Sequence, residues 1–86
     1  MNSLCRALIW NACFLELSES STVDPDAAIQ ELEQMAAFLQ QGTQAEQEAF
    51  IQECKSESER LLQSGEAQDA KVAAFVAELP NSLGLQ

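Results

Sequence analysis

Apolar residues recur every three or four positions along most of the chain, with polar residues between them, which is the period of amphipathic α-helices. Small polar residues, glycine and proline interrupt this pattern and divide it into four segments. The expected helices span about 3–18, 25–41, 44–63 and 66–79, followed by a short tail at 80–86. No segment shows a strand signal. The pattern predicts an all-α fold: one small antiparallel helical bundle, with three long helices and a shorter fourth.

Capping residues set the expected helix boundaries. Asp24 precedes a proline and can cap the second helix, while Thr43 and Glu46 have the spacing of a capping box for the third. Gly42 is expected to end the second helix in a left-handed conformation. Pro80 is expected to end the fourth, because proline cannot continue the backbone hydrogen bonding of a helix.

The last three helices each carry one apolar stripe, and these stripes are expected to meet in a core. Ser58 makes a small gap in the stripe of the third helix. The stripes consist of Ala28, Ile29, Leu32, Met35, Ala36 and Leu39 in the second helix, Phe50, Ile51, Cys54, Leu61 and Leu62 in the third, and Val72, Phe75, Val76 and Leu79 in the fourth.

The first helix is apolar around most of its circumference. One face carries Leu4, Leu8, Ala12 and Leu15, and the opposite face carries Trp10, Cys13, Phe14 and Leu17. A helix of this kind must be covered on both sides. Two interpretations remain open at this point. The helix is either a central element packed on both faces by its own chain, or an interface for a homodimer or partner through Trp10, Phe14 and Leu17.

The charge balance narrows the possible partners. The chain has 86 residues, of which 14 are acidic and four basic, so its formal net charge is -10. A surface of this charge repels nucleic-acid phosphates and anionic membranes, so neither is expected as a direct partner. A basic protein is its natural complement.

The residues do not suggest an enzyme. Histidine is absent, so no Ser-His or Cys-His pair can form, and the three cysteines have no zinc-site spacing. Each of Cys5, Cys13 and Cys54 lies on or beside an apolar stripe, which favours buried core thiols. We therefore expect no catalytic residue, no metal and no cofactor.

The cysteines and the N-terminal segment indicate the cellular compartment of the protein. An odd, scattered set of three cysteines does not form a disulfide framework. The apolar run at 7–17 has a single preceding arginine, is interrupted by Asn11 and Glu16, and is not followed by a small-x-small cleavage site. It is also too short to span a bilayer. These features predict a cytoplasmic protein.

The acidic residues lie in part on the flanks of the apolar stripes. Glu46, Glu53 and Glu57 project to one flank of the third helix, on a surface expected to be solvated, and Glu31 adds a carboxylate from the second helix. Phe38 falls about 120° from the core stripe of its helix, beside Glu31. This surface either only keeps the protein in solution or docks a basic partner, with Glu31, Glu46, Glu53, Glu57 and Phe38 as its contact residues.

Size, charge, the absence of catalytic residues and a spare apolar face together resemble the small acidic helical immunity and antidote proteins of bacteria. No family motif is matched residue by residue, so the resemblance assigns no residue roles. It implies a cytoplasmic protein that binds a cognate, basic toxin or effector stoichiometrically and occludes its active site. Two alternatives stay open: a structural, adaptor or secretion-chaperone-like dimeric module, and a nucleic-acid mimic that inhibits a nucleic-acid-binding protein.

Overall fold

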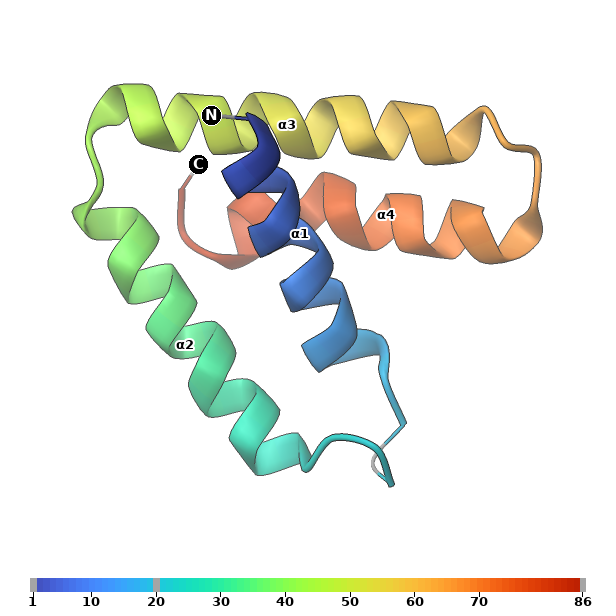
Figure 1. Cartoon of the computed structure of the whole chain (residues 1–86), viewed down its shortest axis with the longest axis horizontal. Coiled ribbons are helices and arrows are strands. Elements are labelled where there is room, and N and C mark those ends of the chain that lie inside the picture. Colours follow the sequence, from blue (N-terminus) through green and yellow to red (C-terminus); the bar gives the residue numbers. More distant parts are fainter. Residues whose placement is uncertain (1, 20, 86) are drawn as a thin grey trace.

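A computed structural model describes residues 2–19 and 21–85, so Met1, Ser20 and the last residue of the expected tail, Gln86, lie outside it. The described residues form four α-helices and no strand (Figure 1), which confirms the predicted all-α class. The helices are α1 (Asn2–Leu17), α2 (Pro25–Gln41), α3 (Gln44–Leu62) and α4 (Ala67–Ser82).

The helices α3 and α4 lie side by side and run in opposite directions, as Figure 1 shows. Their close approach depends on Ser58, whose buried hydroxyl donates a hydrogen bond to the Ala73 carbonyl at 2.9 Å. The helix α1 crosses this pair and contacts all three other helices. The helix α2 diverges from α3 and meets the rest of the fold mainly along α1.

The core lies where α1 crosses the α3–α4 pair. Its largest fully buried side chains are Ile9, Phe50, Cys54, Val76 and Leu79. The helix α2 contributes fewer buried residues, Ala28 and Met35, and Ile29 from its expected stripe is 53% exposed. On α3, Leu62 is likewise exposed rather than packed. These two stripe assignments were wrong because α2 diverges from the core and Leu62 is the last residue of its helix.

The expected N-terminal caps are confirmed. The Asp24 carboxylate accepts a hydrogen bond from the backbone N–H of Ala27 at 3.1 Å. Thr43 and Glu46 form the complete capping box at the start of α3. The helix α2 ends before Gly42 as expected, but the left-handed conformation expected of this glycine was wrong: its φ of -69° and ψ of 166° are extended values, and left-handed glycines occur instead at positions 65 and 84.

The prediction that α4 stops at Pro80 was also wrong. The helix continues to Ser82, so it has 16 residues, the same length as α1. It ends in a Schellman motif: the N–H of Leu85 donates to the Pro80 carbonyl at 2.9 Å, and the N–H of Gly84 donates to the Asn81 carbonyl at 3.1 Å. Pro80 therefore lies inside the last turn of α4, where it is buried and its carbonyl accepts the terminal bond from Leu85.

None of the described helices is long and apolar enough to cross a membrane.

Candidate protein-binding groove

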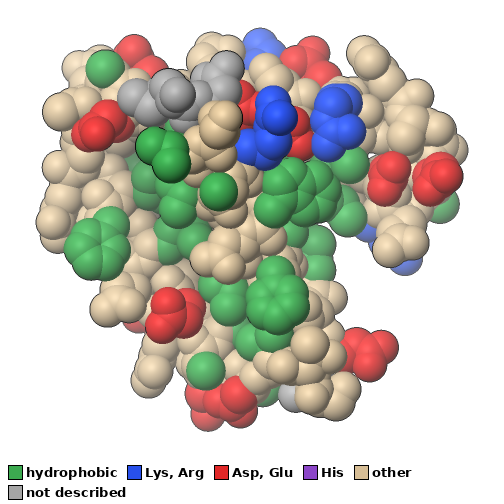
Figure 2. All heavy atoms as spheres, viewed as in Figure 1, with side chains coloured by type: hydrophobic (Ala, Val, Ile, Leu, Met, Phe, Trp, Pro, Cys, Tyr) green, Lys and Arg blue, Asp and Glu red, His purple; other side chains and the backbone are tan. Residues whose placement is uncertain are grey.

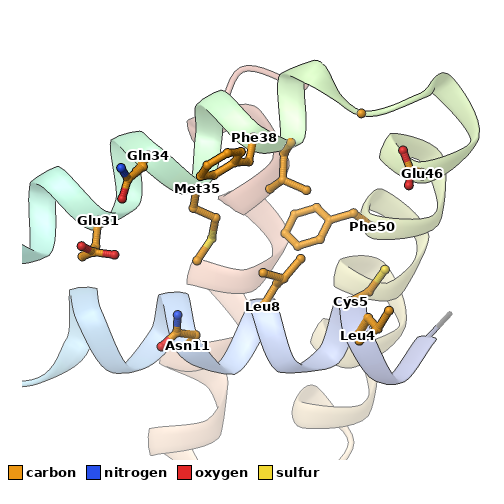
Figure 3. A pocket seen from close by; sticks show the side chains of 12 residues that line it. Leu4, Cys5, Leu8, Asn11, Glu31, Gln34, Met35, Phe38, Glu46 and Phe50 are labelled. Carbon is orange, nitrogen blue, oxygen red and sulfur yellow. The ribbon is translucent and has the colours of Figure 1, made fainter.

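A groove of about 410 Å³ runs between α1 and α2, and the start of α3 closes one end of it (Figure 3). We call it the α1–α2 groove. The two helices pack on one core but leave this space between them on the side of Leu4 and Phe38. Twelve residues line it: Leu4, Cys5, Leu8, Asn11, Glu31, Gln34, Met35, Phe38, Leu39, Gly42, Glu46 and Phe50.

The floor of the groove is apolar. Cys5, Met35 and Phe50 are buried in the core beneath it, and Leu8 and Leu39 pack against that core. Any group placed in the groove would therefore exchange water for hydrocarbon and gain hydrophobic free energy, roughly 25 cal/mol for each Å² of apolar surface removed from water.

The rim of the groove combines exposed apolar side chains with carboxylates. Leu4 on α1 is 70% exposed and Phe38 on α2 is 68% exposed, the two most exposed large hydrophobic side chains described. Glu31 lies at one end, opposite Asn11, and Glu46 lies at the other end (Figure 3). Large exposed apolar groups bordered by polar ones are typical of interaction sites.

The groove is lined by two carboxylates, Glu31 and Glu46, and by no lysine or arginine. Every groove residue lies between positions 4 and 50, and between Arg6 and Lys55 the sequence contains no lysine or arginine. The acidic residues of α2 and of the first half of α3 consequently have no basic neighbour on their own helix to offset them. An uncompensated field of one sign attracts groups of the opposite sign and speeds their encounter.

Glutamine side chains fix the C-terminal end of α2, where the groove closes. The Gln47 side-chain amide of α3 donates to the carbonyls of Leu39 and Gln40 at 3.0 and 3.2 Å, and the Leu39 carbonyl also accepts the N–H of Gly42. Gln40 itself donates to the Leu83 carbonyl at the end of α4, at 2.8 Å. These bonds satisfy carbonyls that a helix leaves without internal partners, and they hold this end of α2 against α3 and α4.

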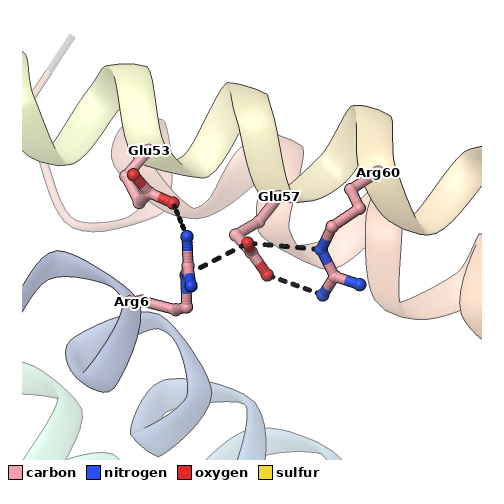
Figure 4. A network of polar contacts seen from close by, with 4 residues as sticks. All are labelled: Arg6, Glu53, Glu57 and Arg60. Atoms are coloured by element: carbon pink, nitrogen blue, oxygen red, sulfur yellow. Dashed lines mark hydrogen bonds and ion pairs between the residues drawn. The ribbon is translucent and has the colours of Figure 1, made fainter. Parts of the chain in front are cut away.

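The other two glutamates expected on the docking surface, Glu53 and Glu57, are buried. Only 5% and 2% of their surfaces are exposed, so the expectation that they lie on a solvated flank was wrong. Both face α1, where the Arg6 guanidinium lies 3.5 Å from Glu53 and 3.3 Å from Glu57 (Figure 4). Arg60, three residues after Glu57 on the same helix, completes the network with a 2.9 Å ion pair to Glu57.

The network determines the ionisation of Glu57. Its pKa lies below the ordinary value of 4.5, chiefly because Arg60 donates hydrogen bonds to the carboxylate. Burial opposes this effect, while the positive charges of Arg60 and Arg6 and the nearby Trp10 indole add to it. Glu57 is therefore a charged group buried between two guanidinium groups that remain largely exposed.

The sequence does contain a signal for this burial. Residue 57 follows Phe50 by seven positions, about two helical turns, so Glu57 shares the face of Phe50 rather than a flank. A carboxylate on a core stripe requires a cation to pair with. The partner in α1, Arg6, is 47 residues from Glu53 in the chain and could not be identified from local spacing.

All three cysteines are buried free thiols, as the sequence predicted. Burial raises the pKa of each thiol, and it raises that of Cys54 to about 12. Neutral, buried thiols are poor nucleophiles and poor metal ligands. Among the described residues, no group of three or more His, Cys, Asp or Glu side chains is arranged to hold a metal ion.

The first helix exposes a second apolar surface, away from the groove. Trp10, Phe14 and Leu17 are 39%, 53% and 49% exposed, and we call these three residues the α1 stripe. Their positions place them about 120° around the helix from the groove-lining residues of α1. Figure 2 shows hydrophobic side chains uncovered over α1, with basic side chains near its crossing with α3. The interpretation of α1 as a helix covered on all sides by its own chain was therefore wrong.

The structure divides the expected contact residues into three groups. Glu31, Phe38 and Glu46 meet at the α1–α2 groove. Trp10, Phe14 and Leu17 form the separate α1 stripe, and the carboxylates at 53 and 57 belong to the buried network. Sequence reasoning did not identify the apolar floor as part of a site, because a core stripe and a groove floor have the same helical period.

Comparisons of the chain with protein-family models, with curated proteins and with solved structures found no match.

Proposed function

We propose that this chain is a non-catalytic binding protein that neutralises a cognate basic bacterial toxin or effector by binding it stoichiometrically and occluding its active site. The observation that carries the proposal is that Phe38, Glu31 and Glu46 all line one groove with an apolar floor. Exposed aromatic side chains often dominate the binding energy of an interface, and acidic rims steer a basic partner toward them.

The contact surface consists of Glu31, Glu46 and Phe38 rather than the larger acidic row expected from the sequence. Burial of Glu53 and Glu57 removes two carboxylates from that row. This weighs against the nucleic-acid mimic, whose carboxylates would have to be exposed along a line in order to replace phosphates. It leaves a compact patch with an apolar centre, which is the usual organisation of a protein interface.

A structural or adaptor role is the second candidate, because the α1 stripe exposes three large apolar side chains that the fold leaves uncovered. Such a module would pair two copies, or join one copy to a partner, through Trp10 and Phe14. It would have no inhibitory activity.

Affinity capture followed by an activity assay tests the first candidate. The tagged chain is used to capture proteins from an extract of its own cells at low and high salt, and the captured protein is then purified. We expect one basic partner at equal stoichiometry, displaced by salt, whose toxic or enzymatic activity falls to zero at one equivalent of the chain. A purified partner whose activity is unchanged by excess chain would refute neutralisation.

Matched variants locate the interface. Glu31→Gln with Glu46→Gln changes the net charge by two and should weaken the partner's binding by about tenfold or more. Glutamine at position 46 preserves the capping box, so α3 should remain intact. Glu33→Gln with Glu48→Gln makes the same charge change on the same two helices outside the groove and should have little effect.

A further inference from the structure

We infer that the α1–α2 groove receives a single amphipathic α-helix of the partner, with a lysine or arginine at each end of its apolar face. This inference rests on the proposed function, and it specifies which part of the partner enters the groove. Three features carry it: the shape of the groove, the chemistry of its floor and the position of its charges.

The shape is that of a trough between two helices. On α1 the lining positions are 4, 5, 8 and 11, and on α2 they are 31, 34, 35, 38 and 39. Each set repeats every three or four residues, so each forms a continuous ridge along its helix. At 1.5 Å per residue the two ridges extend about 10 and 12 Å, and the groove continues beyond the end of α2 to Gly42 and Glu46. A third helix of about three turns matches this length.

The floor selects a helix over an extended peptide. Leu8, Met35 and Phe50 present hydrocarbon and sulfur, and the described residues form no sheet edge to which a strand could be added. An extended peptide would bury unpaired backbone N–H and C=O groups against this floor, at a cost for each. A helix satisfies its backbone internally and offers only an apolar stripe, which is how amphipathic helices occupy hydrophobic grooves.

The two carboxylates at the ends of the groove determine where the basic residues of the partner helix should lie. Glu31 stands at one end of the groove and Glu46 at the other (Figure 3), where its carboxylate lies close to Gly42. One oxygen of Glu46 accepts the N–H of Thr43 at 2.8 Å, and a carboxylate can accept further bonds. From Glu31 to Gln41, the last residue of α2, the helix axis rises about 15 Å. The partner helix should therefore carry its two basic residues about ten or eleven positions apart, with apolar residues between them.

A second copy of this chain is a poor occupant, because its own net charge of -10 repels the acidic rim. A helix of a basic protein suits both the floor and the rim. Its lysines or arginines would gain from the field, and its apolar residues would cover Phe38 and Leu4, which are otherwise exposed to water.

The test uses a synthetic helical peptide of about 16 residues, with leucine at helical spacing and lysine at both ends of the leucine face. One control peptide replaces the lysines by glutamates. A second control has the same composition, but its leucines are distributed around the helix. Binding to the full chain is measured by fluorescence anisotropy at about 50 mM salt, and helix formation is measured by circular dichroism.

We expect the first peptide to bind and become helical, and both controls to bind at least about tenfold more weakly. Phe38→Ala, and Glu31→Gln with Glu46→Gln, should each weaken the peptide about tenfold, whereas Glu33→Gln with Glu48→Gln should change affinity less than about twofold. Phe38 is largely exposed, so its substitution should leave the melting temperature nearly unchanged. Equal binding of the three peptides, or equal binding to groove and control variants, would overturn the inference.

The purified partner separates the two hypotheses. If groove variants weaken the partner but the lysine peptide does not bind, the partner uses another structure in the groove, so the helix inference fails and the proposed function stands. If the lysine peptide binds at the groove but the partner binds the groove variants as tightly as the wild-type chain, the partner does not dock in the groove and the inference fails. If the captured partner is not inhibited at all, the proposed function itself fails.

Discussion

The Nε atom of Arg6 lies 3.3 Å from Oε1 of Glu57 and connects the first helix to the third across the core. Glu57 is 2% exposed, whereas the side chain of Arg6 is 56% exposed. The carboxylate has therefore lost nearly all its water while the guanidinium keeps much of its own. Burying a charge is costly unless a partner offsets the loss, so Arg6 and Arg60 together make the buried position of Glu57 possible.

The ion pair between Arg6 and Glu53 has the same difference in exposure, with a buried carboxylate and a largely exposed guanidinium. Substituting either partner should therefore change the free energy of unfolding by a different amount. Arg6→Met leaves the buried Glu53 carboxylate without a guanidinium and leaves Glu57 with that of Arg60 alone, and it should lower the free energy of unfolding by about 2–3 kcal/mol. Glu53→Gln leaves behind an arginine that water can solvate and should cost about 1 kcal/mol or less. Urea denaturation of both variants measures the difference. Equal losses would contradict the asymmetry.

The lowered pKa of Glu57 predicts a loss of stability in acid. Because the pKa is lower in the folded state than its ordinary value of 4.5, the folded state binds fewer protons between the two values. The contribution of Glu57 is therefore complete above about pH 4.5 and is lost as pH falls through the folded-state pKa. Urea unfolding at intervals from pH 7 to pH 2.5 should show the wild-type advantage over Glu57→Gln shrinking across that range. A difference independent of pH would contradict this assignment.

Burial of the three thiols predicts that they are unreactive in the folded protein. With its pKa raised to about 12, Cys54 is almost entirely protonated at pH 8, and the thiolate is the reactive form. Labelling with a maleimide or a disulfide reagent should be slow for the native chain and rapid in denaturant. The unfolded chain releases the Cys54 proton near the ordinary pKa of 9.0, whereas the folded protein holds it up to about pH 12. The free energy of unfolding should therefore also decline as pH rises above 9.0. Rapid native labelling would contradict the buried positions.

The two left-handed glycines predict a graded effect of alanine. Gly65 and Gly84 share a φ of 78°, but a Cβ at 65 would meet open space, whereas one at 84 would lie 2.7 Å from the Gln40 amide nitrogen. Gly65→Ala should cost about 1 kcal/mol from backbone strain alone. Gly84→Ala should cost about 2 kcal/mol, because the amide that holds α2 to Leu83 must also move. Thermal denaturation measures the stability loss of each variant. Equal losses would show that displacement of the Gln40 amide adds no cost at position 84.

The accuracy of sequence reasoning here depended on how local each feature is. Helix starts were predictable because caps such as that of Asp24 act within three residues. The end of α2 before Gly42 was also predictable, but the conformation of Gly42 and the continuation of α4 past Pro80 were not, because the end of α2 is held by bonds from Gln47 and Pro80 is buried against the rest of the fold. Helical spacing places Glu57 on the face of Phe50, but it does not identify Arg6, the partner from α1 that pairs with the buried carboxylates.

The same limit applies to the candidate site. Phe38 and Glu31 could be singled out because their positions on the helical wheel are local properties. The groove between them and α1 could not, because it depends on the angle between two helices that the sequence does not specify. Glu46, at the start of α3, joins this site only because α2 ends beside it.

The α1 stripe predicts a salt dependence opposite to that of partner binding. Two copies that approach through Trp10, Phe14 and Leu17 bring together net charges of -10, so their association should be weak at low salt and strengthen as salt screens the repulsion. Binding of a basic partner at the groove should weaken under the same change. Sedimentation velocity at about 50 and 500 mM salt measures the self-association of the wild-type chain and of the double variant Trp10→Ala with Phe14→Ala. Self-association that salt weakens, or that survives the double variant, would show that these residues do not form the contact between copies.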